Sequence, residues 1–106
     1  MKLLARLRAM CGGPRDGALL RVSLANALLA QGDAAAAVAE LRRALEFDPD
    51  YSAAWKLLGK TLADNGDTAA ASDAYRSGIA AAITRGDKQA EKEMTVFLRR
   101  LEKIHK

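Results

Sequence analysis

The chain has 106 residues, of which 50% are hydrophobic and only 5% are aromatic, and its formal net charge is +4. This length suits a single domain, and a composition rich in Ala and Leu favours helices packed on helices over a sheet. A single cysteine, Cys11, excludes an internal disulfide, and no apolar run reaches the roughly 18–20 residues of a membrane span. We therefore expect a cytoplasmic protein without disulfides or membrane-spanning segments.

The first predicted element is a short amphipathic helix over residues 2–11. Its apolar face holds Leu3, Leu4, Leu7 and Met10. Arg6 and Arg8 interrupt the apolar stretch too early to leave the hydrophobic region of a signal peptide. We expect residues 1–17, this helix and its loop, to cover the exposed side of the next element. A basic helix that binds a membrane surface or a partner is the alternative.

Residues 18–51 form the next segment, which predicts two helices, over 18–31 and 34–47. Between them stands Gly32-Asp33, in which the glycine tolerates the conformation of a helix end and the aspartate can cap the next helix. Pro49 ends the second helix, because the residue before a proline disfavours the helical region.

Residues 52–85 repeat this plan, with helices predicted over 52–64 and 68–85. Asp50 or Ser52 is expected to cap the first of them, whose apolar stripe holds Trp55, Leu58, Gly59 and Leu62. Gly59 within that stripe indicates that a neighbouring helix comes very close. Ile83 stands where Pro49 stood one repeat earlier, so the second helix is expected to continue to about residue 85.

Residues 86–106 predict one long capping helix that begins after Asp87. Its apolar stripe holds Ala90, Met94, Phe97, Leu98, Leu101 and Ile104. Arg99, Arg100, Lys103 and Lys106 are expected to face solvent. A helix of this kind covers the last apolar face of a helical repeat array, which would otherwise meet water.

The two central segments are copies of one another at a spacing of 34 residues. Nine positions of the second copy keep their size class in the first, and the Gly-Asp turn keeps its identity. The matching positions Trp55, Leu58, Gly59, Gly66, Asp67, Ala71 and Tyr75, together with Asp48-Pro49, resemble the tetratricopeptide repeat signature. The resemblance implies a single domain over residues 1–106, an all-α right-handed helical solenoid of two repeats with flanking helices. Arg21 and Ile83 depart from the signature.

Catalytic chemistry has little support in the sequence. The one histidine, His105, stands next to the end of the chain, and no Cys-His pair, serine elbow or phosphate-binding glycine loop is present. We predict that the protein is not an enzyme and needs no cofactor or metal. Residues 1–17 and 85–106 each carry an excess of three positive charges, but no stacking aromatics accompany them, which argues against a nucleic-acid site.

The resemblance implies a concave groove that holds an extended peptide or a partner helix. Carried onto this chain, its lining positions are Leu19, Val22, Asn26, Leu29 and Ala30 from the first repeat and Ala53, Lys56, Lys60, Ala63 and Asp64 from the second. Lys56 and Lys60 are four residues apart and share a helix face, so they could hold a carboxylate between them. An ordinary solvated helix face explains the two lysines equally well.

The predicted function is therefore non-catalytic protein–protein interaction, with the groove residues Val22, Asn26, Leu29, Lys56, Lys60 and Asp64 binding a peptide that can be acidic. The protein is expected to be a monomer or a weak homodimer. One alternative is a structural subunit that self-associates through its flanking amphipathic helices. A second is an accessory that binds nucleic acid through its basic ends.

Overall fold

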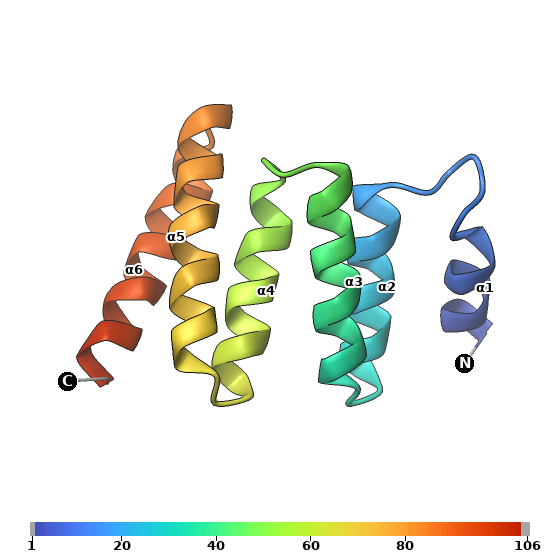
Figure 1. Ribbon diagram of the computed structural model, residues 1–106, viewed down its shortest axis with the longest axis horizontal. Helices are drawn as coiled ribbons and strands as arrows, with labels where there is room; N and C mark the ends of the chain where they lie inside the picture. The colour runs from blue at the N-terminus through green and yellow to red at the C-terminus, as the bar shows by residue number, and fades with distance from the viewer. Residues whose placement is uncertain (1, 105–106) are drawn as a thin grey trace. The chain divides into compact units, whose positions relative to one another are not determined.

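The computed structural model describes residues 2–104, and within them the chain forms six helices and no strands (Figure 1). The helices are α1 (Lys2–Met10), α2 (Ala18–Ala30), α3 (Ala34–Phe47), α4 (Ser52–Asp64), α5 (Thr68–Arg85) and α6 (Lys88–Ile104). The predicted all-α helical repeat fold is confirmed. The helices group into two compact units, one ending at Pro49 and the other beginning at Asp50.

The first unit is built on the antiparallel pair α2 and α3. Asp33 caps α3, because its carboxylate accepts a hydrogen bond from the backbone N–H of Ala36 at 3.1 Å. α1 packs against α2 and buries Leu4. Leu3 is 60% exposed, so the prediction that it shares the buried face of α1 is wrong. It stands only one residue from Leu4, and a helix turns adjacent side chains about 100° apart.

The second unit consists of α4, α5 and α6, and glycines allow its helices to pack closely. A Cβ atom on Gly59 of α4 would lie 2.5 Å from the ring of Tyr75 on α5. A Cβ atom on Gly78 of α5 would lie 2.6 Å from the Cβ of Trp55 and would also collide with the sulfur of Met94 on α6. The close helix approach predicted at Gly59 is therefore present.

The junction of α5 and α6 follows the predicted sequence of caps. Gly86 ends α5 with a φ of 70°, a left-handed conformation that suits glycine. Asp87 then accepts a hydrogen bond from the backbone N–H of Ala90 and begins α6. The start of α4 is as predicted but its cap is not, because Tyr51 holds the N-cap position without a side-chain bond. Ser52 is the first helical residue, and its hydroxyl instead donates to Asp87 at 2.9 Å.

Burial confirms the repeat of 34 residues. Leu24, Ala25, Leu28, Ala37, Leu41 and Ala44 are buried, and so are their counterparts Leu58, Gly59, Leu62, Ala71, Tyr75 and Gly78. α6 repeats the burial pattern of α4 at a spacing of 36 residues, since Ala54 and Leu58 correspond to the buried Ala90 and Met94. A step of 34 residues finds no repeat there, because α5 is four residues longer than α3 while the connection that follows it is two residues shorter. The single domain and the right-handed solenoid stay predictions.

Candidate functional site

The predicted binding face of the second repeat lies on α4, and α6 contributes to it. The ammonium group of Lys56 on α4 lies 2.9 Å from a carboxylate oxygen of Glu93 on α6. Both side chains are 37% exposed, so the pair lies at the edge of the helix interface rather than inside it. Lys56 therefore already binds a carboxylate of its own chain.

Lys60 and Asp64 form a second pair on the same face, with 2.9 Å between the ammonium nitrogen and the carboxylate oxygen. Both side chains are about two-thirds exposed, and such pairs exchange readily with water. The structure does not show Lys56 and Lys60 sharing one carboxylate. Lys60 is the lysine with the more exposed charge of the two, so it is the better placed to meet a partner.

A hollow of about 280 Å³ opens between the second half of α4 and the second half of α6. Its lining consists of Lys60, Ala63, Asp64, Tyr75, Phe97, Arg100 and Leu101. The floor is apolar and the charged side chains stand at the rim. Apolar hollows with a few polar groups are the usual form of a binding site for a small group or a side chain.

Tyr75 forms part of the floor of the hollow and is only 3% exposed. Within the described residues every buried polar side-chain atom has a hydrogen-bond partner. Burial, followed by the negative charge of Asp64, raises the pKa of the phenol above its ordinary value of 10.0.

Phe97 links the floor to the rim. Its ring centroid lies 5.7 Å from that of Tyr75, and the guanidinium of Arg100 lies 5.9 Å from it on another side. The groove positions taken from the repeat resemblance did not include Phe97, Arg100 or Glu93. At a spacing of 36 residues Arg100 of α6 corresponds to the groove position Asp64 of α4, whereas Glu93 and Phe97 correspond to Leu57 and Thr61, which are not groove positions.

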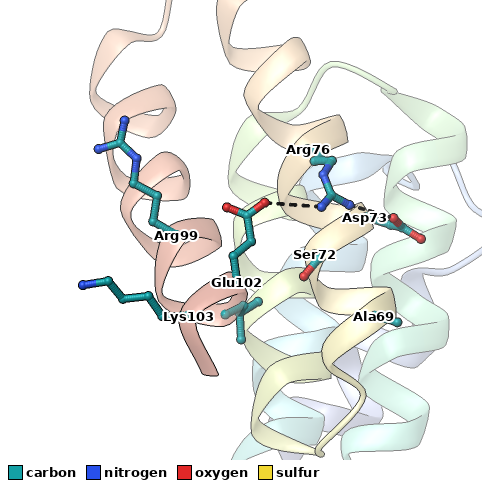
Figure 2. Close-up of a pocket in the computed structure, with 8 residues that line it drawn as sticks. Ala69, Ser72, Asp73, Arg76, Arg99, Glu102 and Lys103 are labelled. Atoms are coloured by element: carbon teal, nitrogen blue, oxygen red, sulfur yellow. Dashed lines mark hydrogen bonds and ion pairs between the residues drawn. The ribbon is translucent and has the colours of Figure 1, made fainter. Parts of the chain in front are cut away.

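A second hollow, of about 700 Å³, lies between the start of α5 and the end of α6 (Figure 2). Arg76 of α5 spans it and pairs with Asp73 at 3.2 Å and with Glu102 of α6 at 3.5 Å. Figure 2 shows Arg99 and Lys103 extending from α6 away from α5. This hollow is broader than the one beside Tyr75, and Ala69 and Leu101 give it an apolar part between charged side chains of both signs.

The predicted residues of the first repeat all lie on α2. Val22 and Leu29 are half-buried, and Asn26 is exposed, as is Leu19 at 70%. The exposed amide of Asn26 stands between the apolar side chains of Val22 and Leu29, so this surface is available to contact a partner. α2 and α4 belong to different compact units, and a groove that both helices line stays a prediction of the repeat resemblance.

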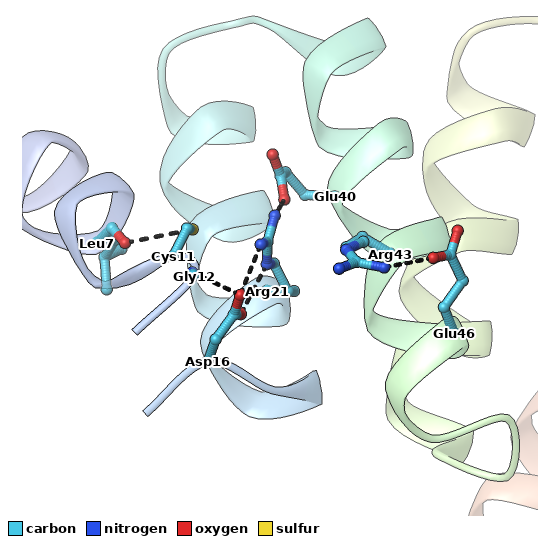
Figure 3. Close-up of polar contacts among 8 residues, drawn as sticks. All are labelled: Leu7, Cys11, Gly12, Asp16, Arg21, Glu40, Arg43 and Glu46. Atoms are coloured by element: carbon cyan, nitrogen blue, oxygen red, sulfur yellow. Dashed lines mark hydrogen bonds and ion pairs between the residues drawn. The ribbon is translucent and has the colours of Figure 1, made fainter. Parts of the chain in front are cut away.

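Arg21, the departure from the repeat signature on α2, has a structural role (Figure 3). Its guanidinium donates two hydrogen bonds to Asp16, at 2.9 and 2.8 Å, and a third to Glu40 of α3 at 2.8 Å. Asp16 also accepts the backbone N–H of Gly12 at 2.7 Å. Arg21 therefore ties the loop before α2 to both helices of its repeat. The Arg21 guanidinium and the Gly12 N–H hold the pKa of Asp16 far below its usual range.

Neither a metal centre nor a membrane span is evident in the described part of the chain. Residues 2–104 contain no group of three or more His, Cys, Asp or Glu side chains that could hold a metal ion. None of their helices is both long enough and apolar enough to cross a bilayer. The predicted role of His105 as a terminal surface residue lies outside the described residues.

Comparison with known sequences gives two matches. A family model described as "Tetratricopeptide repeat" matches residues 17–61. A TPR repeat-containing protein of Pseudomonas aeruginosa is 56% identical over 88 residues, which make up 83% of this chain and 84% of that protein. The residues that the family model matches comprise the first repeat and most of α4.

Comparison with solved structures gives the same fold. A protein from Bordetella parapertussis, solved in solution, is 50% identical with a TM-score of 0.80, over 95% of this chain and 88% of that one. A tetratricopeptide repeat domain protein from Salinibacter ruber is 30% identical with a TM-score of 0.78, over 84% of this chain and 89% of that one. The MamA protein, 19% identical with a TM-score of 0.68, shares the fold.

Proposed function

Because this chain belongs to the tetratricopeptide repeat family, whose fold is generally a protein–protein interaction module, we propose that it is a non-catalytic binding protein that acts through α4 and α6. The site is the hollow between these two helices. The partner inserts an apolar side chain above Tyr75 and Phe97 and places polar groups against Lys60 and Arg100.

One observation carries the proposal, namely a hollow whose lining combines the apolar Tyr75, Phe97 and Leu101 with the charged Lys60, Asp64 and Arg100. A buried aromatic pair surrounded by charged groups is the arrangement found at the energetic centre of protein interfaces. Closing this hollow with a partner side chain removes the half-buried ring of Phe97 from water.

The remaining predicted groove residues enter the proposal as a continuation of this contact. Asp64 stands at the rim of the hollow, and Lys56 supports α6 through Glu93. Val22, Asn26 and Leu29 of α2 are the positions that a longer partner segment would reach. We propose the cytoplasm as the compartment.

The experiment is affinity capture from a lysate of the source cell with a variant that fills the hollow. Ala63→Trp places a large side chain over the floor, and Ala80→Trp makes the same change at an exposed position of α5 outside the hollow. Both variants are first compared with the native protein by helical content and melting temperature. A partner that the native protein and Ala80→Trp retain, and Ala63→Trp loses, supports the proposal. A partner retained by all three proteins contradicts it.

A second candidate function is self-association through the flanking helices. Two observations favour it, since Leu3 of α1 is 60% exposed and Ile104 of α6 is 77% exposed. Isolated apolar side chains on a surface are common, so the candidate ranks second. A molecular mass in solution that rises with protein concentration, and returns to that of the monomer in a Leu3→Lys/Ile104→Lys variant, would establish it.

A further inference from the structure

The outer face of α6 carries a row of positively charged side chains. In an α-helix the positions of Lys88, Lys92, Val96, Arg99, Arg100 and Lys103 fall within an arc of about 120°. All six side chains are exposed, and the five cations form no ion pair with any described residue. From Lys88 to Lys103 this arc, the cationic face, runs for about 22 Å.

The carboxylates of α6 lie outside this arc. Glu93 faces α4, where it pairs with Lys56, and Glu102 faces α5, where it pairs with Arg76. Glu91, the remaining one, is half-buried and stands at the edge of the arc, where it lines a shallow hollow with Lys92, Val96 and Arg99. Two of the three carboxylates therefore face neighbouring helices, whereas the five cations face solvent.

Helix stability does not explain the cationic face. Lys88 and Lys92 are four residues apart, as are Arg99 and Lys103, and like charges at this spacing repel. Lys88 and Lys92 also stand in the first turns of α6, where the helix dipole disfavours cations. Only Lys103, in the last turn, gains from the dipole. An arrangement that works against the isolated helix is better explained by a ligand of opposite charge.

Two features of the cationic face define that ligand. Val96 lies in the middle of the arc and is 44% exposed, so a ligand that covers the face must bring an apolar group to this point. Arg100 belongs to both the cationic face and the rim of the hollow beside Phe97. The face therefore continues the site proposed above, and the inference rests on that proposed function.

We propose that the cationic face of α6 binds an acidic amphipathic segment of the partner protein, one whose carboxylates recur every three or four residues around an apolar side chain. The carboxylates pair with Lys92, Arg99 and Lys103 while the apolar side chain covers Val96. A nucleic acid fits less well, because a phosphate backbone offers nothing apolar to Val96. Within the described residues this face also carries no exposed aromatic side chain on which bases could stack.

The test uses synthetic peptides and fluorescence anisotropy. The probe is a labelled peptide of about 16 residues, matched to the length of the face, with Glu along one helical side and one Leu at its centre. A second peptide replaces every Glu by Gln, and a single-stranded RNA and a DNA duplex of similar charge serve as competitors. Binding is measured at about 50 and about 300 mM salt, because screening weakens exposed charge pairs.

The variant is Lys92→Glu/Arg99→Glu/Lys103→Glu, and Lys92→Gln/Arg99→Gln/Lys103→Gln removes the charges without reversing them. The matched control, Arg6→Glu/Arg8→Glu/Arg15→Glu, makes the same change in net charge with three exposed arginines of the first unit. All proteins must show native helical content. We expect the Glu peptide to bind about tenfold or more weakly to the reversed variant, and the control to bind as the native protein does.

Three results would overturn the inference. The first is that the charge-reversed variant and the control lose binding of the Glu peptide equally. The second is that the Gln peptide binds as tightly as the Glu peptide. The third is that either nucleic acid binds more tightly than the Glu peptide. The Ala63→Trp protein separates the two proposals. If this variant binds the Glu peptide normally and also captures the cellular partner, the hollow is not the binding site, and the proposal for the cationic face is retained. If this variant loses the cellular partner and the Glu peptide does not bind even the native protein, only the proposal for the hollow is retained.

Discussion

The ammonium nitrogen of Lys56 and a carboxylate oxygen of Glu93 lie 2.9 Å apart and join α4 to α6 across 37 residues of sequence. Because both side chains are 37% exposed, water screens the pair, and we expect a coupling free energy of about 0.2–1 kcal/mol. A double-mutant cycle of Lys56→Ala and Glu93→Ala, followed by urea unfolding, measures it. The Lys60–Asp64 pair is more exposed and should give a smaller coupling free energy. A larger coupling for Lys60–Asp64 than for Lys56–Glu93 would contradict the geometry.

A Gly59→Ala substitution should destabilise the protein even though alanine is the better helix former. The gain in helix propensity is about 1 kcal/mol, whereas crowding the packed ring of Tyr75 costs about 1–3 kcal/mol. We expect a lower midpoint of urea unfolding.

The first repeat supplies the control for this substitution, since it carries Ala25 and Leu41 at the two matching positions. Gly59→Ala/Tyr75→Leu copies that combination and removes the ring from the contact. The double variant should be more stable than the sum of its single variants predicts. Additive effects would show that Gly59 and Tyr75 do not restrict one another.

The repeat made most of the fold predictable. A period of 34 residues with Gly-Asp turns placed the helices of both repeats to within a residue of their observed ends, because turn and cap residues act locally. The cap of α4 was missed, since Ser52 bonds to Asp87, a residue 35 positions away that no local pattern reveals. The role of Arg21 was missed for a similar reason, because it depends on Glu40 of the facing helix.

Of the candidate site, only the residues that α4 contributes were predictable from the sequence. Lys56, Lys60 and Asp64 of α4 follow from the repeat resemblance, and they do lie on the face that borders the hollow. Glu93, Phe97 and Arg100 come from α6, whose shift of two residues relative to the repeat conceals its equivalence with α4. The pairing of Lys56 with Glu93 therefore could not be read from the spacing of the two lysines.

The stability contributed by Asp16 should depend on pH. Its pKa in the folded protein is depressed by Arg21 and Gly12, so the folded state favours the ionised carboxylate more than the unfolded chain does. This contribution is present above the unfolded pKa, about 3.9, and is lost as the pH falls below it. Asp16→Asn should lower the free energy of unfolding at neutral pH, and the gap to the native protein should narrow in acid. A gap independent of pH would contradict the geometry.

The phenol of Tyr75 should titrate above 10.0 in the folded protein, because burial and then the charge of Asp64 both disfavour the phenolate. Ultraviolet titration of a Tyr51→Phe variant isolates this group, since the chain has two tyrosines. Adding Asp64→Asn should lower the midpoint while leaving it above the ordinary value. If Asp64→Asn leaves the titration midpoint of Tyr75 unchanged, the carboxylate of Asp64 lies farther from the phenol than the structure shows.

The most direct test of binding between α4 and α6 is site-specific photo-crosslinking in the source cell. A benzophenone amino acid at position 63 points its reactive group over the hollow, and the same amino acid at position 80 serves as the matched site on the exposed side of α5. We predict a defined protein adduct from position 63 and none from position 80. Adducts from position 80 alone, or the same adducts from both positions, would contradict a binding site at the hollow.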